Sequence, residues 1–259
     1  MGTEPGHSPV RVEVDRAILI LTIDRPAARN AVNREVADLI AEAMGRLDDS
    51  PELRAGVITG AGSTFCAGMD LKAFVTGELP VHADRGFAGL TRRPPAKPLI
   101  AAVEGYALAG GLEIVLACDL VVAARGSWFG IPEVKRGLVA GAGGLLRLPR
   151  RIPYNIAMEL AMLGEPVTAA RMSELGLVNR VVDDGEALCG ALALARVVAA
   201  NGPLAVAATK RVLLESPDWG RTEAWEEQER ILAPVTSSED AREGATAFAE
   251  KRAPVWRGR

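Results

Sequence analysis

Residues 97–124, KPLIAAVEGYALAGGLEIVLACDLVVAA, decide the fold class of this chain. Residues 97–103 are short, apolar and followed by Gly105, which predicts a buried strand. Gly110 and Gly111 then open an apolar segment with helical character, and residues 119–124 predict another buried strand. Buried strands that alternate with helices are typical of parallel sheets covered on both faces. The sequence therefore predicts an α/β fold.

The segment before this stretch follows a compatible pattern. Residues 10–14 alternate apolar and polar positions and residues 17–23 are almost continuously apolar, which predicts two strands. Residues 33–47 carry apolar side chains at helical spacing, with Asn33 as the expected N-cap. Residues 55–59 predict a further short buried strand, which ends at Gly60.

The composition changes at about residue 168, where alanine, leucine and arginine become frequent and the pattern becomes helical. Residues 221–251 carry dense charge on a helical pattern. We expect residues 1–195 to form a core with the active site, and residues 196–259 to form a helical region packed on this core or on another subunit. No Gly/Ser linker separates the two parts, so freely moving domains are not expected.

The overall composition is that of an ordinary soluble globular protein, with 259 residues, 49% hydrophobic and 24% charged. A formal net charge of −3 and an aromatic content of 4% disfavour a nucleic-acid binder. The longest apolar stretch, residues 112–124, contains Glu113 and Asp119 and is too short to span a bilayer. We therefore expect neither a nucleic-acid partner nor a membrane partner.

The N-terminus and the cysteine content indicate a reducing compartment. Residues 1–9 lack the basic and apolar regions of a signal peptide, so we expect a cytoplasmic protein. Cys66, Cys118 and Cys189 are an odd number without CxxC spacing, and His7 and His82 are the two imidazoles. A disulfide framework, a structural zinc site and a His-dependent catalytic triad are therefore not expected.

Common cofactor and nucleophile motifs also lack support. The run Gly60-Ala61-Gly62-Ser63-Thr64-Phe65 begins like a dinucleotide-binding fingerprint but has phenylalanine at its last position. The chain contains no GxxxxGK[ST], GxSxG or HExxH motif. Nicotinamide-dependent hydride transfer, Walker-type hydrolysis and zinc proteolysis are therefore disfavoured.

Two glycine-containing turns stand out instead. Residues 65–72, FCAGMDLK, and residues 104–111, EGYALAGG, place small residues where a backbone can approach a ligand and donate from its N–H groups. Each turn could equally be a surface turn or a site of close helix–strand packing. Together they offer two donors that could converge on one carbonyl oxygen, as an oxyanion hole requires.

Two glutamates lie in apolar surroundings. Glu113 lies between Leu112 and Ile114, where an unpaired carboxylate is costly to bury, although an acid in the first turn of a helix is also favoured by the helix dipole. Glu133 lies in an apolar loop and could pair with Lys135 or Arg136. If the two carboxylates met across a cleft, they could hold one water and divide the acid and base roles.

Several motifs resemble those of the crotonase (enoyl-CoA hydratase/isomerase) superfamily over almost the whole chain. They are residues 23–31 (IDRPAARNA), 58–60 (ITG), 65–72 (FCAGMDLK), 97–105 (KPLIAAVEG), 129–133 (FGIPE), 141–148 (GAGGLLRL) and 243–252 (EGATAFAEKR). The resemblance implies a spiral of ββα units that form two roughly perpendicular sheets. It also implies a C-terminal helical region that assembles the chain into a homotrimer or a dimer of trimers.

The resemblance assigns roles to particular residues. Glu113 and Glu133 match the acid/base pair, and the backbone N–H groups of Met69 and Gly110 match the oxyanion hole. The implied contacts to coenzyme A come from Ala27, Ala28, Arg29, Ala67, Asp70 and Leu71, and from Phe248 and Lys251 of a neighbouring subunit. No cofactor is implied, because coenzyme A is part of the substrate.

The implied activity is that of an enoyl-CoA hydratase, which adds water reversibly and in syn fashion to a 2-enoyl-CoA to give a 3-hydroxyacyl-CoA, as in fatty acid metabolism. Two alternatives stay open: a double-bond isomerase that uses Glu133 alone, and a non-catalytic acyl-CoA-binding homologue. Some family members bind RNA, but the one dense basic cluster, Arg147, Arg150 and Arg151, is interpreted as a solvated or subunit-facing group.

The chain departs from the family pattern at a few positions. Ala109 stands where many members have a third glycine, and Leu145-Leu146 follow the glycine cluster where polar residues are common. Residues 73–93 are the least similar, and in the family this region walls the acyl chain. The length and branching of the acyl group therefore do not follow from the resemblance.

Overall fold

The computed structural model describes residues 8–259, so the expectations for His7 and for most of the segment tested for a signal peptide lie outside the described residues. Its main sheet has six strands in the order β1-β2-β3-β6-β8-β11. Strand β1 (Val10–Asp15) runs antiparallel to β2 (Ile18–Ile23), and the other neighbouring pairs are parallel. These parallel strands are β3 (Ala55–Gly60), β6 (Leu99–Val103), β8 (Leu120–Ala124) and β11 (Arg180–Val182).

A smaller sheet lies beside the main one. It has three strands in the order β10-β9-β7, namely β10 (Val167–Thr168), β9 (Trp128–Gly130) and β7 (Tyr106–Leu108). A short hairpin pairs β4 (Val81–His82) with β5 (Gly86–Phe87). Strand β7 follows β6 after two residues, so the chain passes from the main sheet to the smaller one directly before the glycines at 110 and 111.

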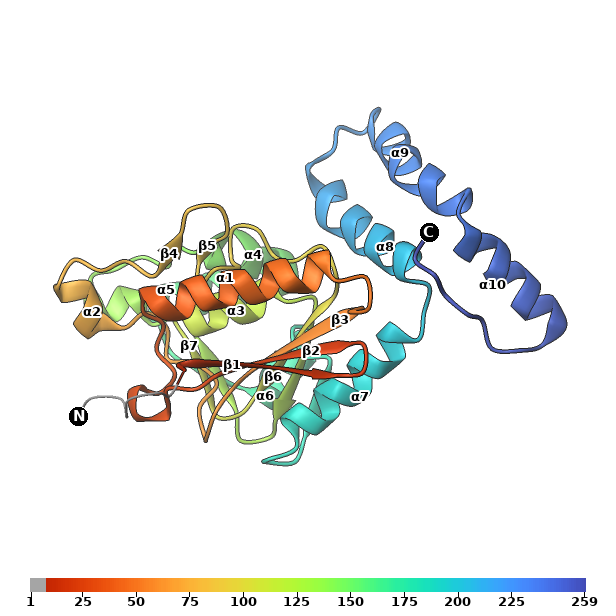
Figure 1. Ribbon diagram of the computed structural model, residues 1–259. Helices are drawn as coiled ribbons and strands as arrows, with labels where there is room; N and C mark the ends of the chain where they lie inside the picture. Colours follow the sequence, from red (N-terminus) through yellow and green to blue (C-terminus); the bar gives the residue numbers. More distant parts are fainter. Residues whose placement is uncertain (1–7) are drawn as a thin grey trace.

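Helices cover both faces of the main sheet (Figure 1). Helix α1 (Arg34–Asp49) begins at the expected N-cap, where the Asn33 side chain accepts a hydrogen bond from the Val36 N–H. Helices α1 and α3 (Gly110–Ala117) share one apolar core with alternate residues of β2, Leu19, Leu21 and Ile23. Residues on opposite sides of a strand face opposite layers, and Ile18 accordingly joins the second core.

The second core lies under α7 (Ala187–Ala199). This helix presents Ala187, Ala191 and Ala195 to the sheet, and all three are fully buried. Such small side chains at a spacing of four residues form one face and let the helix approach the strands closely. The expected boundary between residues 195 and 196 falls inside α7, which continues to Ala199.

The remaining elements are short helices that shape the loops. They are the α-helices α2 (Leu71–Val75), α4 (Gly144–Arg151), α5 (Tyr154–Leu163) and α6 (Ala169–Glu174), and the 3-10 helices η1 (Pro26–Ala28), η2 (Glu133–Arg136) and η3 (Ser216–Asp218).

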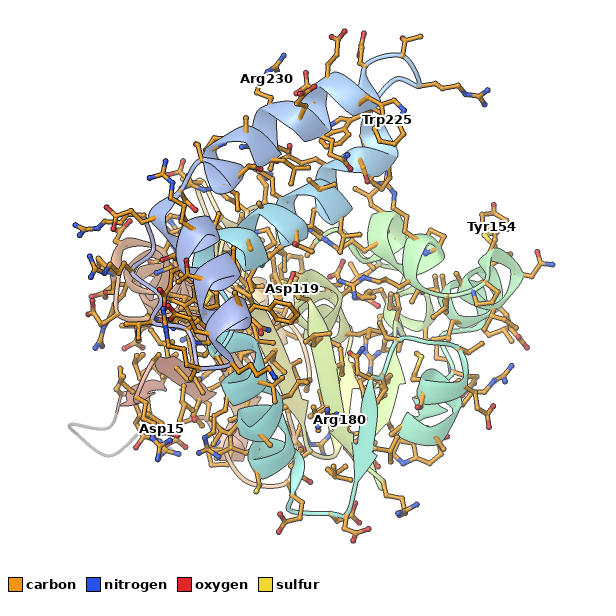
Figure 2. All side chains as sticks on the ribbon, turned by 90° about the vertical axis from the view of Figure 1, so that its right-hand side faces the viewer. Asp15, Asp119, Tyr154, Arg180, Trp225 and Arg230 are labelled. Atoms are coloured by element: carbon orange, nitrogen blue, oxygen red, sulfur yellow. The ribbon has the colours of Figure 1, made fainter. Side chains whose placement is uncertain are left out.

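The last three α-helices extend away from the sheet as a terminal arm, which we define as residues 203–259 (Figure 1). They are α8 (Pro203–Glu215), α9 (Ala224–Thr236) and α10 (Glu239–Glu250). Figure 2 shows Trp225 and Arg230 on the outer part of this arm and Asp119 where the arm meets the sheet. At that junction Lys210 Nζ donates to Asp119 Oδ2 over 2.7 Å and to the Lys97 carbonyl over 2.9 Å.

The prediction of an α/β fold with short buried strands is confirmed. Strand β11 was not predicted, because its three residues lie inside a region of helical composition. Within the described part of the chain, no single helix is long and apolar enough to cross a membrane. Among residues 8–259, one bent pair of helices, residues 187–199 and 203–218, reaches the required length and composition when its halves are taken together.

Candidate active site

A cavity of about 1560 Å³ lies at the edge of the smaller sheet. It is lined by the turn after β3, the start of α3, helix η2 and the loop before α4. Met69, Gly110, Glu113 and Glu133 all contribute to its wall. The structure therefore brings together the four residues predicted to form the acid/base pair and the oxyanion hole.

Glu113 lies in the first turn of α3 and is 3% exposed. Its Oε1 accepts hydrogen bonds from the N–H groups of Ala142 and Gly144, over 2.8 and 2.9 Å, at the start of α4. A helix N-terminus favours a negative charge, so these donors hold the carboxylate in one orientation. Burial raises the pKa of Glu113, although both N–H donors and the charge of Arg147 oppose this shift.

Glu133 is the first residue of η2, and its Oε2 is buried without a hydrogen-bond partner among residues 8–259. The ion pair with Lys135 or Arg136 that the sequence left open is not formed, since Lys135 pairs with Glu165. Burial raises the pKa of Glu133 to about 7, and the charge of Glu113 adds to this effect. At neutral pH Glu133 is therefore available as a proton donor, whereas Glu113 has donors that favour its ionised form.

The two glycine-containing turns pack against each other. The Phe65 N–H donates to the Glu104 carbonyl, and Cys66 bridges to Ala107 of β7. Gly68 has a φ of +96°, and a Cβ there would lie 2.8 Å from Ala109 Cβ and 3.0 Å from Gly110 N. Only glycine adopts this conformation without strain and allows the second turn to come so close.

Both predicted oxyanion donors have a free N–H. Met69 bridges to Val32, but the hydrogen bonds of that bridge use the N–H groups of Val32 and Asp70. Gly110 is the first residue of α3, where backbone N–H groups have no acceptor within the helix. Within residues 8–259 neither N–H donates to a protein acceptor. Both residues line the cavity that holds the glutamates.

The backbone before Gly110 is strained. Ala109 has φ 52° and ψ −126°, a conformation that side chains with a Cβ rarely adopt. Its N–H donates to the Gly130 carbonyl over 2.9 Å, which fixes the turn to the smaller sheet. Phe87 lies over the next residue, because a Cβ on Gly110 would come within 2.5 Å of its ring.

The residues expected to contact coenzyme A divide into two groups. Arg29, Ala67 and Leu71 line the cavity. Asp70 does not line the cavity. Its carboxylate accepts a hydrogen bond from Arg25 Nη2 over 3.0 Å, and it caps α2 by accepting from the Lys72 N–H. Ala27 and Ala28 form η1 with Pro26, next to Arg29 but outside the cavity lining.

Phe248 and Lys251 lie on the terminal arm and not at the cavity of this chain. Phe248 is 86% exposed near the end of α10, and Lys251 forms the C-cap of that helix with a φ of +55°. Their expected role involves the cavity of a neighbouring subunit, and that role stays a prediction.

The three arginines of the basic cluster have intramolecular contacts. Arg147 is half-buried at the cavity and donates to the Thr91 carbonyl over 2.6 Å. The interpretation of the cluster as a solvated group is therefore wrong for Arg147. Arg150 forms an ion pair with Asp218 of η3, and Arg151 donates to the Cys118 carbonyl. Within residues 8–259 no group of three or more His, Cys, Asp or Glu side chains is arranged to hold a metal ion.

Comparison with known proteins assigns the family. The family model described as "Enoyl-CoA hydratase/isomerase" matches residues 13–259. The chain belongs to the enoyl-CoA hydratase/isomerase family. The crotonase fold and the family predicted from the sequence motifs are thereby confirmed.

Several relatives match this family member over nearly its whole length. It is 45% identical over 267 residues to an enoyl-CoA hydratase, EchA19, of Mycobacterium tuberculosis, with 100% of both chains covered. It is 44% identical over 251 residues to a carnitinyl-CoA dehydratase of Salmonella typhi, with 93% of this chain and 95% of that one covered. The crystal structure of enoyl-CoA hydratase EchA1 from Mycobacterium marinum matches with a TM-score of 0.96 and 60% identity, over 98% of this chain and 100% of that one.

Sequence reasoning missed other groups that shape the cavity of this crotonase. Phe87, Arg92 and Arg147 contribute to the lining, as do Leu213 and Pro217 of the terminal arm. The signal for Arg147 was available, because it is a charged residue between leucines in residues 144–148. The contribution of the arm had no local signal, since it depends on long-range contacts such as the ion pair between Asp218 of η3 and Arg150 of α4.

Proposed function

We propose that this chain catalyses the reversible hydration of 2-enoyl-CoA thioesters to 3-hydroxyacyl-CoA. The observation that carries the proposal is one cavity that contains two carboxylates, Glu113 and Glu133, together with the free N–H groups of Met69 and Gly110. Hydration of an enoyl thioester needs these two kinds of group: paired acid and base groups for water, and donors for a developing oxyanion.

The two backbone donors would act on the thioester carbonyl. When water attacks Cβ, negative charge moves through Cα onto the thioester oxygen and gives an enolate. Two N–H groups aimed at this oxygen stabilise the charge as it develops, an effect of about 3 kcal/mol per donor in comparable sites. Because Gly68 brings the Met69 turn against Gly110, neither donor has to move when charge develops.

The glutamates would divide the proton transfers. Glu113, held as a carboxylate by Ala142 and Gly144, takes a proton from the attacking water, whose oxygen bonds to Cβ. Glu133, whose pKa is raised to about 7, gives its proton to Cα. After one turnover Glu113 holds the proton and Glu133 is ionised, so the pair carries one proton before and after reaction. Hydration changes no net oxidation state, so we propose that no redox cofactor takes part.

We further propose that copies of the chain assemble through the terminal arm into a trimer or a dimer of trimers. Apolar side chains are exposed on the arm: Trp225 by 76%, Leu213 by 70% and Phe248 by 86%. Exposed apolar surface of this extent favours burial against a partner. In such an assembly Phe248 and Lys251 would contact coenzyme A bound to a neighbouring chain.

Replacement of each glutamate tests the proposed reaction. Loss of the enoyl-thioester absorbance of crotonyl-CoA follows hydration, and Glu113→Gln should lower kcat by about a hundredfold or more because the base is lost. A double-bond isomerase that uses Glu133 would largely keep its activity in this variant and lose it in Glu133→Gln. Tight binding without turnover of short, long and branched enoyl-CoA substrates would instead identify a non-catalytic homologue.

A further inference from the structure

The cavity is rich in cations although the chain as a whole has a formal net charge of −3. The cavity-lining acids outside the catalytic pair, Glu215 and Asp218, are already paired with Arg211 and Arg150. Six cavity-lining arginines, in contrast, form no ion pair with a carboxylate among residues 8–259. Arg29 lies in a segment expected to contact coenzyme A, and Arg151 donates to the Leu116 and Cys118 carbonyls. The other four are Arg92, Arg93, Arg136 and Arg147.

Arg147 is the most enclosed of these cations. It lies one turn after Gly144 on α4, the helix whose first N–H groups hold Glu113. Its Nη2 donates to the Thr91 carbonyl, which fixes the guanidinium without an ion pair to a carboxylate. Burial lowers the pKa of Arg147 and the like charge of Arg151 lowers it further, while the charge of Glu113 opposes this shift. A half-buried cation beside another cation is costly unless an anion accompanies it.

The other arginines extend this positive surface. Arg92 and Arg93 directly follow Thr91, the residue that Arg147 contacts, and both are exposed. Arg136 lies on η2 and acts electrostatically on Glu133. The cations therefore line the same cavity as the proposed reacting centre and come from residues 92–93, η2 and α4.

The positions of these arginines differ from those of the residues expected to contact coenzyme A, so binding of its phosphates does not explain this positive surface. The residues expected to contact coenzyme A within this chain lie in residues 27–29 and 67–71, where Arg29 lines the cavity. Arg29, which also forms no ion pair among residues 8–259, comes from those segments, but Arg92, Arg93, Arg136 and Arg147 do not. Arg92 and Arg93 lie at the end of residues 73–93, the region that differs most from the family pattern, whereas Arg147 lies in the family-like motif of residues 141–148.

We propose that this site selects acyl groups that end in a carboxylate, which Arg147 and the adjacent Arg92 or Arg93 would bind. This inference rests on the proposed function, because it assumes that the thioester lies at the Met69 and Gly110 donors. A guanidinium can bind a carboxylate through two parallel hydrogen bonds, and such charge-assisted bonds are stronger than neutral ones. The same cations should repel an acyl group that ends in a quaternary ammonium.

Equilibrium binding of saturated thioesters tests this selection without turnover. The dissociation constants of glutaryl-, adipoyl- and suberoyl-CoA are compared by calorimetry with those of pentanoyl-, hexanoyl- and octanoyl-CoA, which differ mainly in the terminal carboxylate. For at least one pair the carboxylate form should bind about tenfold more tightly. Binding of γ-trimethylammoniobutyryl-CoA should be weaker than that of pentanoyl-CoA. If no pair favours the carboxylate form, the inference is overturned.

Arginine variants separate the acyl group from the phosphates. In Arg147→Gln the preference for the carboxylate thioester should fall to about that of the neutral one, and Arg147→Lys should restore part of it. Arg92→Gln and Arg93→Gln alter exposed side chains that make no side-chain hydrogen bond among residues 8–259, so they test the same preference with little risk to folding. Equal weakening of both thioesters in Arg147→Gln would show that Arg147 serves coenzyme A, and would overturn the inference.

The assay of crotonyl-CoA hydration keeps the two proposals apart. If crotonyl-CoA is hydrated and the neutral saturated thioesters bind, but no pair favours the carboxylate, only the acyl-group inference fails. If none of the thioesters binds, both proposals fail.

Discussion

Gly144 and Glu113 are in such close contact that a side chain on residue 144 would displace the carboxylate. The Gly144 N–H donates to Glu113 Oε1 over 2.9 Å, and a Cβ at residue 144 would also lie 2.9 Å from that oxygen. Glycine at residue 144 is therefore needed to leave space for the Glu113 carboxylate. It is not needed for the backbone conformation, because the positive φ belongs to the preceding residue, Gly143.

Gly144→Ala should consequently impair catalysis more than folding. The added methyl group pushes the Glu113 carboxylate from its two donors, and we expect kcat for crotonyl-CoA hydration to fall about tenfold to a hundredfold. Gly141→Ala is the matched control, since the nearest atom to a Cβ there is the Val139 carbonyl oxygen at 3.8 Å. Similar kcat values for the two variants would contradict the role given to Gly144.

The pH dependence of hydration should report the shared proton of the glutamates. The active form has Glu133 protonated and Glu113 ionised, so kcat/KM should fall as pH rises through the raised pKa of Glu133, about 7, and should fall in acid as Glu113 is protonated. Hydration and dehydration must give the same profile, because the addition of water releases no proton. A kcat/KM that stays level between about pH 6 and pH 9 would contradict this assignment.

Glu133 should also reduce stability at alkaline pH. Its folded-state pKa is raised from 4.5 to about 7, so the folded state binds the proton more tightly than the unfolded chain and loses stability as pH rises across that interval. Glu133→Gln should raise the free energy of unfolding by about 1–3 kcal/mol at pH 8, but only slightly near pH 4. Urea unfolding at both pH values measures this difference, and an equal effect at both would rule out the buried charge as its cause.

Relief of the strain at Ala109 should stabilise the protein. A φ of 52° in a residue with a Cβ costs about 1–3 kcal/mol, and Ala109→Gly removes this strain from the folded state. Glycine also gives the unfolded chain more backbone freedom, which opposes the gain by about 0.5–1 kcal/mol. We expect a net gain of about 1 kcal/mol in urea unfolding. Ala107→Gly in β7, two residues earlier, should lose stability because it has no strain to relieve.

The sequence predicted the elements whose signal is local. The alternation in residues 10–14, the apolar run that ends at Ile23 and the Asn33 cap all correspond to observed elements. Glu113 was identified because a carboxylate in an apolar segment is unusual. The three-residue strand β11 had no such signal, because its pairing with β8 alone makes it a strand.

The contacts that complete the site are not local and could not be predicted. The approach of Gly144 to Glu113 joins residues 31 positions apart, and the bond from Arg147 to Thr91 spans 56. The sequence also did not indicate that the Asp70 carboxylate is occupied by Arg25 and by the cap of α2. In each case the chemistry of the residue was readable, but its partner depends on the folded path of the chain.

The anchoring of Lys210 limits how the terminal arm can move. Asp119 Oδ2 accepts from both Lys210 Nζ and the Leu99 N–H at the start of β6, so one carboxylate joins the root of the arm to the central strands. The arm therefore cannot pivot at its base without breaking a bond shared with the sheet. In an assembly formed through the arms, the orientation of each arm relative to its own sheet would set the angle between the chains. A mutation at Asp119, which lies outside the interface formed by the arms, would therefore alter the geometry of the whole assembly.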